Sequence, residues 1–286
     1  MHCAAEIFGY NTPMQRNILI VLGIAALLAL GGFAAWKQGY FAGPATENAT
    51  STPTSASGGG YGVQASSTGD VAITPLPVPS GSDPFPQHPL INRQVSVPAS
   101  FSAEAKAIIL ADIESIRAAL RKNPKDLQAW VELGVRYKAI NEYEAAREAW
   151  EYVSLVSPDN IVSFNNLGDL QHYVFKDYAR AELNFLQAIH NNPNYLLSYL
   201  NLHDLYRLSY KQNTTKAEDI LQQGIKQNPK AIDLMVALAT YYRGKGRIAD
   251  AKVFYERAIA VATDIGNTAL AAALKAEIKA MEGNVQ

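Results

Sequence analysis

The sequence has only one cysteine, Cys3, among its 286 residues. A single cysteine cannot close an intramolecular disulfide, so packing rather than cross-links must stabilise the fold. No histidine lies at a metal-ligand spacing from a cysteine or an acidic residue. The five histidines are His2, His88, His172, His190 and His203. The triplet Gly58-Gly59-Gly60 is followed by neither a helical pattern nor a lysine, so it is not a phosphate-binding loop. We therefore expect no enzyme activity, no cofactor and no metal site.

The sequence also lacks an excess of charge of either sign. It has 25 Lys and Arg against 26 Asp and Glu, a formal net charge of −1, and the part after residue 100 has 22 of each kind. A surface that binds the phosphate backbone of nucleic acid needs a basic excess. Nucleic acid is therefore not an expected partner.

Proline is scarce in the second part of the chain. After Pro98 only four prolines occur, at intervals of 34, 35 and 36 residues: Pro124, Pro158, Pro193 and Pro229. Proline lacks the N–H that a further helical turn needs, and it disfavours helical geometry in the residue before it. Their regular spacing predicts helices that end at a fixed point of a repeated unit.

The residues between these prolines repeat one pattern of large and small side chains. The first unit has Trp130, Leu133, Gly134, Tyr137, Ala146, Trp150 and Val153. The corresponding residues of the later units are Phe164, Leu167, Gly168, Gln171, Ala181, Phe185 and Ala188, then Tyr199, Leu202, His203, Tyr206, Ala217, Leu221 and Gly224, then Met235, Leu238, Ala239, Tyr242, Ala251, Tyr255 and Ala258. Two apolar runs at helical spacing flank a short polar segment in each unit, which predicts a helix, a turn and a second helix. The small residues would let the two helices approach closely.

Two units depart from the pattern. His203 replaces a small residue, and Gln171 replaces an aromatic one. The second and third units also carry one and two extra residues before Ala181 and Ala217. These insertions predict longer turns between the two helices.

The order and spacing of these residues resemble the tetratricopeptide repeat, or TPR. The resemblance implies an all-α, right-handed solenoid of about four helical hairpins, with units at 127–160, 161–195, 196–231 and 232–265. A helix after Ser102 and another at 268–282 each present one apolar face, so we expect them to cover the two ends. The folded domain would then comprise residues 101–286.

One long run without charge lies near the N-terminus, from Asn17 to Trp36, between Arg16 and Lys37. A helix of this length spans roughly 30 Å, the thickness of a bilayer's hydrocarbon core. We interpret it as one retained transmembrane helix after a short tail (1–16), because the apolar region of a cleaved signal peptide is usually shorter. The charge of Arg16 favours a cytoplasmic N-terminus and extracytoplasmic repeats. Met14 is as plausible a start codon as Met1.

The segment 42–100 has a different composition. Of its 59 residues 31 are Pro, Gly, Ser or Thr, and four are charged. Such a composition is typical of a disordered linker with polyproline stretches. We expect it to act as a spacer between the membrane and the repeats.

First helices line the concave groove of TPR proteins, so the resemblance also predicts a binding site. Asn166 and Asn201 occupy equivalent places beside the apolar landmarks, similar to the asparagines with which some family members hold a peptide backbone. A second row, one residue after the tyrosine landmark, consists of Lys138, His172, Arg207 and Arg243. The second row could meet acidic groups of a ligand, or could simply complement the helix dipoles at exposed helix ends.

Two functions are compatible with this organisation. The first is a membrane-tethered adaptor or scaffold that binds a peptide or protein partner in the groove. The alternative is a structural solenoid that associates with copies of itself at the membrane without a peptide ligand. A match to the carboxylate clamp that grips acidic chaperone tails is poor, because Val131, Val135 and Leu197 stand where that clamp has polar or basic residues.

Overall fold

The computed structural model describes residues 61–65, 71–75 and 88–283. The predicted membrane span at 17–36 and most of the predicted linker lie outside these ranges. In the described ranges no helix is both long enough and apolar enough to cross a membrane.

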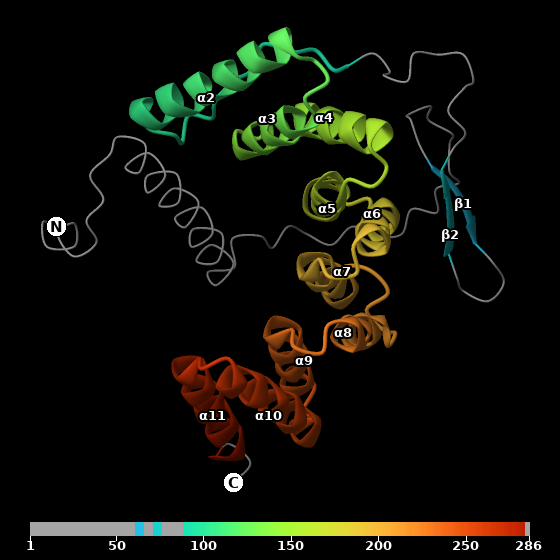
Figure 1. The fold of residues 1–286 in the computed structure, drawn as a ribbon, viewed down its shortest axis with the longest axis vertical. Coiled ribbons are helices and arrows are strands. Elements are labelled where there is room, and N and C mark those ends of the chain that lie inside the picture. Colours follow the sequence, from blue (N-terminus) through green and yellow to red (C-terminus); the bar gives the residue numbers. More distant parts are fainter. Residues whose placement is uncertain (1–60, 66–70, 76–87, 284–286) are drawn as a thin grey trace, which may run out of the picture. The chain divides into compact units, whose positions relative to one another are not determined.

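Residues 103–283 form helices that follow one another in chain order (Figure 1). The helices are α2 (Ala103–Lys122), α3 (Leu127–Ala139), α4 (Tyr143–Val156), α5 (Ile161–Leu170), α6 (Tyr178–Asn191), α7 (Leu196–Leu208), α8 (Lys216–Gln227), α9 (Ile232–Gly244), α10 (Ile248–Asp264) and α11 (Thr268–Gly283). The first helices of the four hairpins, α3, α5, α7 and α9, begin at the first residues of the four expected units. A π-helical turn, η1 (Gln171–Phe175), continues α5. Each helix contacts the next one, and α7 also contacts both α5 and α9. The described helices therefore form a stack of helical hairpins, as the repeat pattern predicts.

Four helices end in the same way, directly before a proline. Their C-cap residues, whose backbone N–H donates to the carbonyl four residues earlier, are Asn123, Ser157, Asn192 and Asn228. The prolines that follow cannot continue the helix. Asparagine or aspartate side chains then accept a backbone N–H at the start of α3 and α5, where Asp126 and Asn160 are the N-caps.

Small residues allow the two helices of a hairpin to touch. A Cβ atom at Gly134 would lie within 3.0 Å of Trp150, and one at Gly168 equally close to Phe185. The indole Nε1–H of Trp150 donates to the carbonyl oxygen of Val131 at 3.1 Å. The large residue of the second helix thus fills the space that the glycine of the first helix leaves open.

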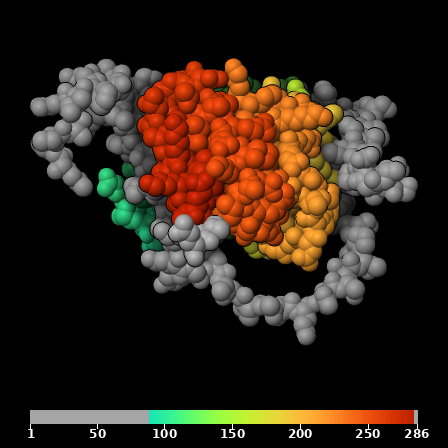
Figure 2. All heavy atoms as spheres, turned by 90° about the horizontal axis from the view of Figure 1, so that it is seen from below, coloured from blue at the N-terminus to red at the C-terminus, as the bar shows by residue number. Residues whose placement is uncertain are grey.

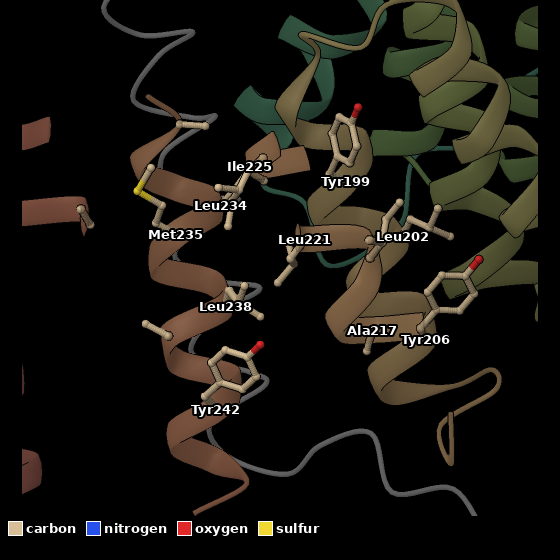
Figure 3. Close-up of a cluster of buried hydrophobic side chains, with 14 of the residues drawn as sticks. Tyr199, Leu202, Tyr206, Ala217, Leu221, Ile225, Leu234, Met235, Leu238 and Tyr242 are labelled. Carbon is tan, nitrogen blue, oxygen red and sulfur yellow. The ribbon is translucent and has the colours of Figure 1, made fainter. Parts of the chain in front are cut away.

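The third and fourth hairpins share a continuous apolar layer (Figure 3). Leu221 and Ile225 of α8 lie between Tyr199 of α7 and Leu234 of α9, and all four side chains are buried. Most buried apolar residues of the described chain belong to one of two clusters, one from Ile91 to Leu170 and the other from Ala181 to Met281. The two clusters meet within the second hairpin, where Phe185 of α6 packs against Gly168 of α5.

The helix α11 covers the C-terminal end of the stack. It lies beside α10 in the view of that end (Figure 2). Its buried residues Ala271, Leu274 and Met281 face the stack, while Lys275, Lys279 and Glu282 are exposed. A polar outer side of this kind is what a terminal repeat needs for solubility.

The other end differs from the expectation of a disordered linker up to residue 100. Residues 88–97, which we call the N-terminal strap, lie against α2, α3 and α4. Ile91 is buried, Arg93 forms an ion pair with Glu148 of α4 at 2.5 Å, and the Ser96 N–H donates to Glu142 at 2.9 Å. The apolar residues Ile91, Val95 and Val97 pack on the first core cluster. The composition of the segment as a whole, rich in proline and serine, did not predict these few contacts.

A second difference concerns residues 61–75. The strands β1 (Tyr61–Ala65) and β2 (Val71–Pro75) form an antiparallel pair, in which Val63 is opposite Ile73 and Ala65 opposite Val71. β-Branched residues favour this conformation. Glycine, serine and threonine dominate the surrounding composition, so the linker prediction missed the pair, whereas the solenoid itself is helical as expected.

The two insertions are accommodated in different ways. The two extra residues of the third unit lengthen the turn between α7 and α8, which runs from Ser209 to Thr215, whereas the turn of the first unit has three residues. The extra residue of the second unit is instead absorbed by η1, which ends at Lys176 with φ 58°. The predicted longer turn is therefore a widened helical turn in that unit.

Candidate functional site

The surface formed by α3, α5, α7 and α9, the first-helix face, contains the six residues predicted to bind a peptide. They are Lys138, Asn166, His172, Asn201, Arg207 and Arg243. All lie on first helices or on η1, but the structure gives them different environments.

Amide groups of α5 and α7 meet at the centre of the first-helix face. The Asn201 Nδ2–H donates to Oδ1 of Asn165 at 3.1 Å, and the Ser198 Oγ–H donates to the same oxygen at 3.0 Å. Asn165 and Ser198 are buried, whereas Asn166 and Asn201 are half-buried. Asn201 therefore has an internal partner, and Asn166 has no hydrogen bond to any residue in the described ranges.

The predicted basic row is paired internally. Lys138 forms an ion pair with Asp169 of α5, and Arg207 forms one with Asp204 on its own helix at 2.8 Å. Arg243 likewise pairs with Glu277 of α11 at 2.5 Å. The hypothesis that these cations await acidic groups of a ligand did not include these neighbouring carboxylates. Each of these three cations therefore has a carboxylate partner within the chain.

The fourth member of the row, His172, is buried, with only 1% of its surface exposed. Its Nε2 lies 2.9 Å from Oγ of Ser209 at the end of α7, and its ring stacks on Tyr173 with centroids 4.0 Å apart. The other ring nitrogen, Nδ1, is buried, and no residue in the described part of the chain is its hydrogen-bond partner. Burial lowers the pKa of His172, an effect that the carboxylates of Asp169 and Asp204 oppose.

Exposed apolar side chains recur on the first-helix face, and the sequence pattern did not single them out. Val162 and Leu197 hold the same place in α5 and α7, 35 residues apart, and Tyr173 and Leu208 hold another such place. Leu197 is 46% exposed and Val162 40% exposed. Large apolar residues that recur one repeat apart, outside the positions of the packing pattern, could have indicated this surface in the sequence.

At the joints, by which we mean the contacts between the second helix of one unit and the first helix of the next, a tyrosine and a cation bind one glutamate. The Tyr206 hydroxyl donates to the buried Glu182 of α6 at 2.5 Å, and Lys211 donates to the same carboxylate at 2.6 Å. One unit later, Tyr242 and Arg247 both donate to Glu218 of α8, each at 2.7 Å. Burial and this hydrogen bond raise the pKa of Tyr206 well above its usual range.

The joint between the first and second units has no such pair. Arg147 stands where the later units have glutamate, and Gln171 stands where they have tyrosine. These two residues cannot form the tyrosine–glutamate hydrogen bond of the later joints. Arg147 instead pairs with Glu144 at 2.6 Å and Glu151 at 3.1 Å and lies over the ring of Phe175.

His203, the other departure from the pattern, is a packing residue. Its Nδ1 lies 2.7 Å from the carbonyl oxygen of Ala217 in the first turn of α8, and the edge of its ring meets Tyr241. Burial lowers its pKa. In residues 88–283 no group of three or more His, Cys, Asp or Glu side chains could hold a metal ion.

The hairpin stack, the glycine-to-aromatic packing and the proline-terminated second helices define a helical-repeat fold of the tetratricopeptide type. No protein-family model matches the chain, and no curated protein matches it. Among solved structures the chain is similar to MamA, with 18% identity, a TM-score of 0.46, and coverage of 60% of this chain and 99% of that one. A thermophilic TPR protein from Thermus thermophilus shows 20% identity and a TM-score of 0.45, with coverage of 62% and 92%. PilF from Pseudomonas aeruginosa shows 18% identity and a TM-score of 0.45, with coverage of 62% and 85%. Likenesses of this strength carry no information about function.

Proposed function

We propose that this protein is a non-catalytic interaction module, tethered to a membrane, that binds an extended peptide segment of a partner protein on its first-helix face. The observation that carries the proposal is the arrangement on α5 and α7. There the half-buried amides of Asn166 and Asn201 lie on helices that also expose Val162 and Leu197. Amides can donate to and accept from a peptide backbone, and exposed apolar side chains can pack on its side chains.

The ion pairs of this face favour a ligand that needs no acidic side chains for binding. Lys138 and Arg207 are already paired with Asp169 and Asp204. An acidic ligand would have to compete with these carboxylates, and exposed ion pairs contribute little to affinity. We therefore infer a ligand in which apolar side chains and backbone amides, rather than carboxylates, provide the recognition.

Binding to a peptide can be tested with the full-length chain in detergent micelles. Random dodecapeptides displayed on phage would be selected against it, and the affinity of the enriched peptides measured by calorimetry. Replacing Leu197 by Glu would place a charge among the apolar contacts and should weaken binding at least about tenfold, the effect of roughly 1.4 kcal/mol. Replacing Asn166 by Ala should weaken binding by about 1–3 kcal/mol if a ligand group is left unpaired.

A matched control is available on a second helix. Leu155 of α4 is 42% exposed, nearly the same as Leu197, but it lies outside the first-helix face. The Leu155→Glu variant should bind the selected peptides like the parent. Failure to enrich any peptide, together with a concentration-dependent increase in mass, would favour the alternative of a self-associating scaffold.

The membrane tether rests on the uncharged run from Asn17 to Trp36, and the extracytoplasmic orientation rests on Arg16. Protease added to intact cells should degrade the repeats, and detergent should be needed to extract the full-length chain. Protection of the repeats would reverse the orientation. A soluble mature chain that begins near Gly43 would rule out the anchor.

A further inference from the structure

A buried side-chain nitrogen of η1, Nδ1 of His172, has no hydrogen-bond partner among the described residues. The rest of the ring is well held, by Ser209 at Nε2 and by the rings of Tyr173 and Tyr178 at centroid distances of 4.0 and 6.0 Å. An unpaired buried polar atom is costly, so native structures seldom retain one without a reason. This atom is therefore a candidate for a partner that comes from outside the chain.

The protonation of the ring decides which chemistry Nδ1 offers. A neutral imidazole has one N–H, and placing it at Nε2 lets the ring donate to Oγ of Ser209. The opposite tautomer would bury an unpaired N–H at Nδ1, and protonation of the ring would do the same while adding a buried charge. In the tautomer with the proton at Nε2, Nδ1 is an acceptor, and its missing partner is a hydrogen-bond donor.

The π-helical turn is what brings His172 to this position. The extra residue of the second unit widens the helix at Gln171–Phe175, and turns of this kind are frequent at functional sites. At the equivalent place the other units carry Lys138, Arg207 and Arg243, which are ion-paired donors. The second unit alone presents an acceptor in this row.

Tyr173 is the exposed neighbour of this buried ring. Its ring lies 4.0 Å from that of His172 between centroids, yet 44% of its own surface is exposed, and no other residue in the described ranges hydrogen-bonds to it. A rotation of its side chain therefore breaks no hydrogen bond of the described structure.

We propose that His172 is a specificity-determining residue, whose Nδ1 accepts a backbone N–H of the bound peptide once Tyr173 has turned aside. The inference rests on the proposed function, because it names an anchor within the same binding face. It requires an unsubstituted amide at one position of the ligand, so that a proline or an N-methylated residue at that position is excluded.

The test uses a dodecapeptide enriched on the full-length chain in detergent micelles and its single N-methylated derivatives. At one position N-methylation should weaken binding about tenfold to the parent chain but less than about twofold to the His172→Phe variant, which has no acceptor. All other N-methylations should affect the two chains equally. Thermal unfolding followed by circular dichroism would show that the variant is folded.

A measurement on the unsubstituted chain complements the variant. In ¹⁵N spectra of the free protein, Nδ1 of His172 should have the shift of an unprotonated nitrogen without a hydrogen bond, and the enriched peptide should move it towards the hydrogen-bonded value. A peptide whose binding depends on Leu197 but leaves this resonance and the N-methyl series unchanged would overturn the inference and leave the proposed function intact. Failure to obtain any peptide ligand would overturn both.

Discussion

The ring of Trp150 occupies the space in which a Cβ atom of residue 134 would lie. Nε1, Cε2 and Cδ1 of the indole all approach within 3.0 Å of an ideal Cβ built on Gly134. The same ring is held in place by its hydrogen bond to the carbonyl oxygen of Val131. The close approach of α3 and α4 therefore depends on the absence of a side chain at Gly134.

Replacing Gly134 by Ala should destabilise the repeats by about 1–3 kcal/mol, because the indole cannot move without losing its hydrogen bond. Urea unfolding of the full-length chain, followed by circular dichroism, measures this change. Gly244 provides the control, since a Cβ there meets nothing within 4 Å. Gly244→Ala should change stability by no more than about 1 kcal/mol, and in the favourable direction. Equal effects of the two substitutions would contradict the packing argument.

The buried carboxylate of Glu182 should be important for the joint between the second and third units. Replacing it by Ala leaves the Tyr206 hydroxyl buried without an acceptor, which we expect to cost about 1–3 kcal/mol in denaturant unfolding. Glu182→Gln keeps an acceptor and should cost less. The side chain of Glu218 makes the equivalent contacts but is 20% exposed against 7% for Glu182, so Glu218→Ala should also cost less. A larger loss for Glu218→Ala would show that exposure does not set the strength of these joints.

Stability should fall as the pH drops below about 6.5, the ordinary pKa of histidine. Burial lowers the pKa of both His172 and His203 in the folded chain, so in this window the unfolded chain binds more protons than the folded one. The two neutral histidines contribute their full stabilisation at pH values above their pKa in the unfolded chain. This contribution is lost as the pH falls towards their pKa in the folded chain, by up to about 1.4 kcal/mol per pH unit for each histidine. Unfolding free energies measured between about pH 7.5 and 5.5 should show this slope, and His172→Phe should reduce it. The exposed His190, replaced by Gln, is the control for histidine content. An unchanged slope in His172→Phe would refute the assignment.

The N-terminal strap should be released by the loss of Arg117. Its buried guanidinium donates to the carbonyl oxygen of Arg93 at 2.6 Å and to the Tyr137 hydroxyl at 3.1 Å. In Arg117→Ala the strap loses its central contact, so trypsin should cut after Arg93 several-fold faster, because cleavage follows the population of the open state. Arg180→Ala removes an exposed arginine whose ion pair lies within its own helix turn, and it should leave the cleavage rate unchanged. An unaltered rate in Arg117→Ala would mean that the strap is held by its other contacts.

Periodic residues made the hairpins predictable. The spacing of Gly134 and Trp150, repeated in Gly168 and Phe185, requires a close helix pair, and the structure has these pairs in contact. The prolines located the helix ends for the same reason, since each follows a C-cap residue. Physical rules that act within one unit were sufficient here.

The binding face was less predictable because it depends on contacts between units. Sequence equivalence placed Lys138, Arg207 and Arg243 in one row but could not show that Asp169, Asp204 and Glu277 would pair with them. It also singled out Asn166, whereas the adjacent Asn165, which points into the stack, is the acceptor for Asn201. Neighbouring positions on a helix differ by about 100° in direction, so an error of one residue selects another environment.

The strap and the π-helical turn could not be predicted for a different reason. Each depends on a few residues in a segment whose overall composition or length indicates a linker or a loop instead. Ile91 and Arg93 anchor a segment rich in proline and serine, and one inserted residue before Ala181 was compatible with a loop as well as with a widened turn. In both places tertiary contacts choose among local conformations that the sequence pattern leaves equally open.

The close packing of successive helices has a consequence for cooperativity. In a stack of repeats, each unit is stabilised by its neighbours, and folding spreads through the interfaces between them. Each described helix from α2 to α11 contacts the next one, and within the second hairpin Gly168 of α5 lies against Phe185 of α6. Loss of a terminal helix would therefore weaken the unit beside it, and unfolding would spread along the stack from that end.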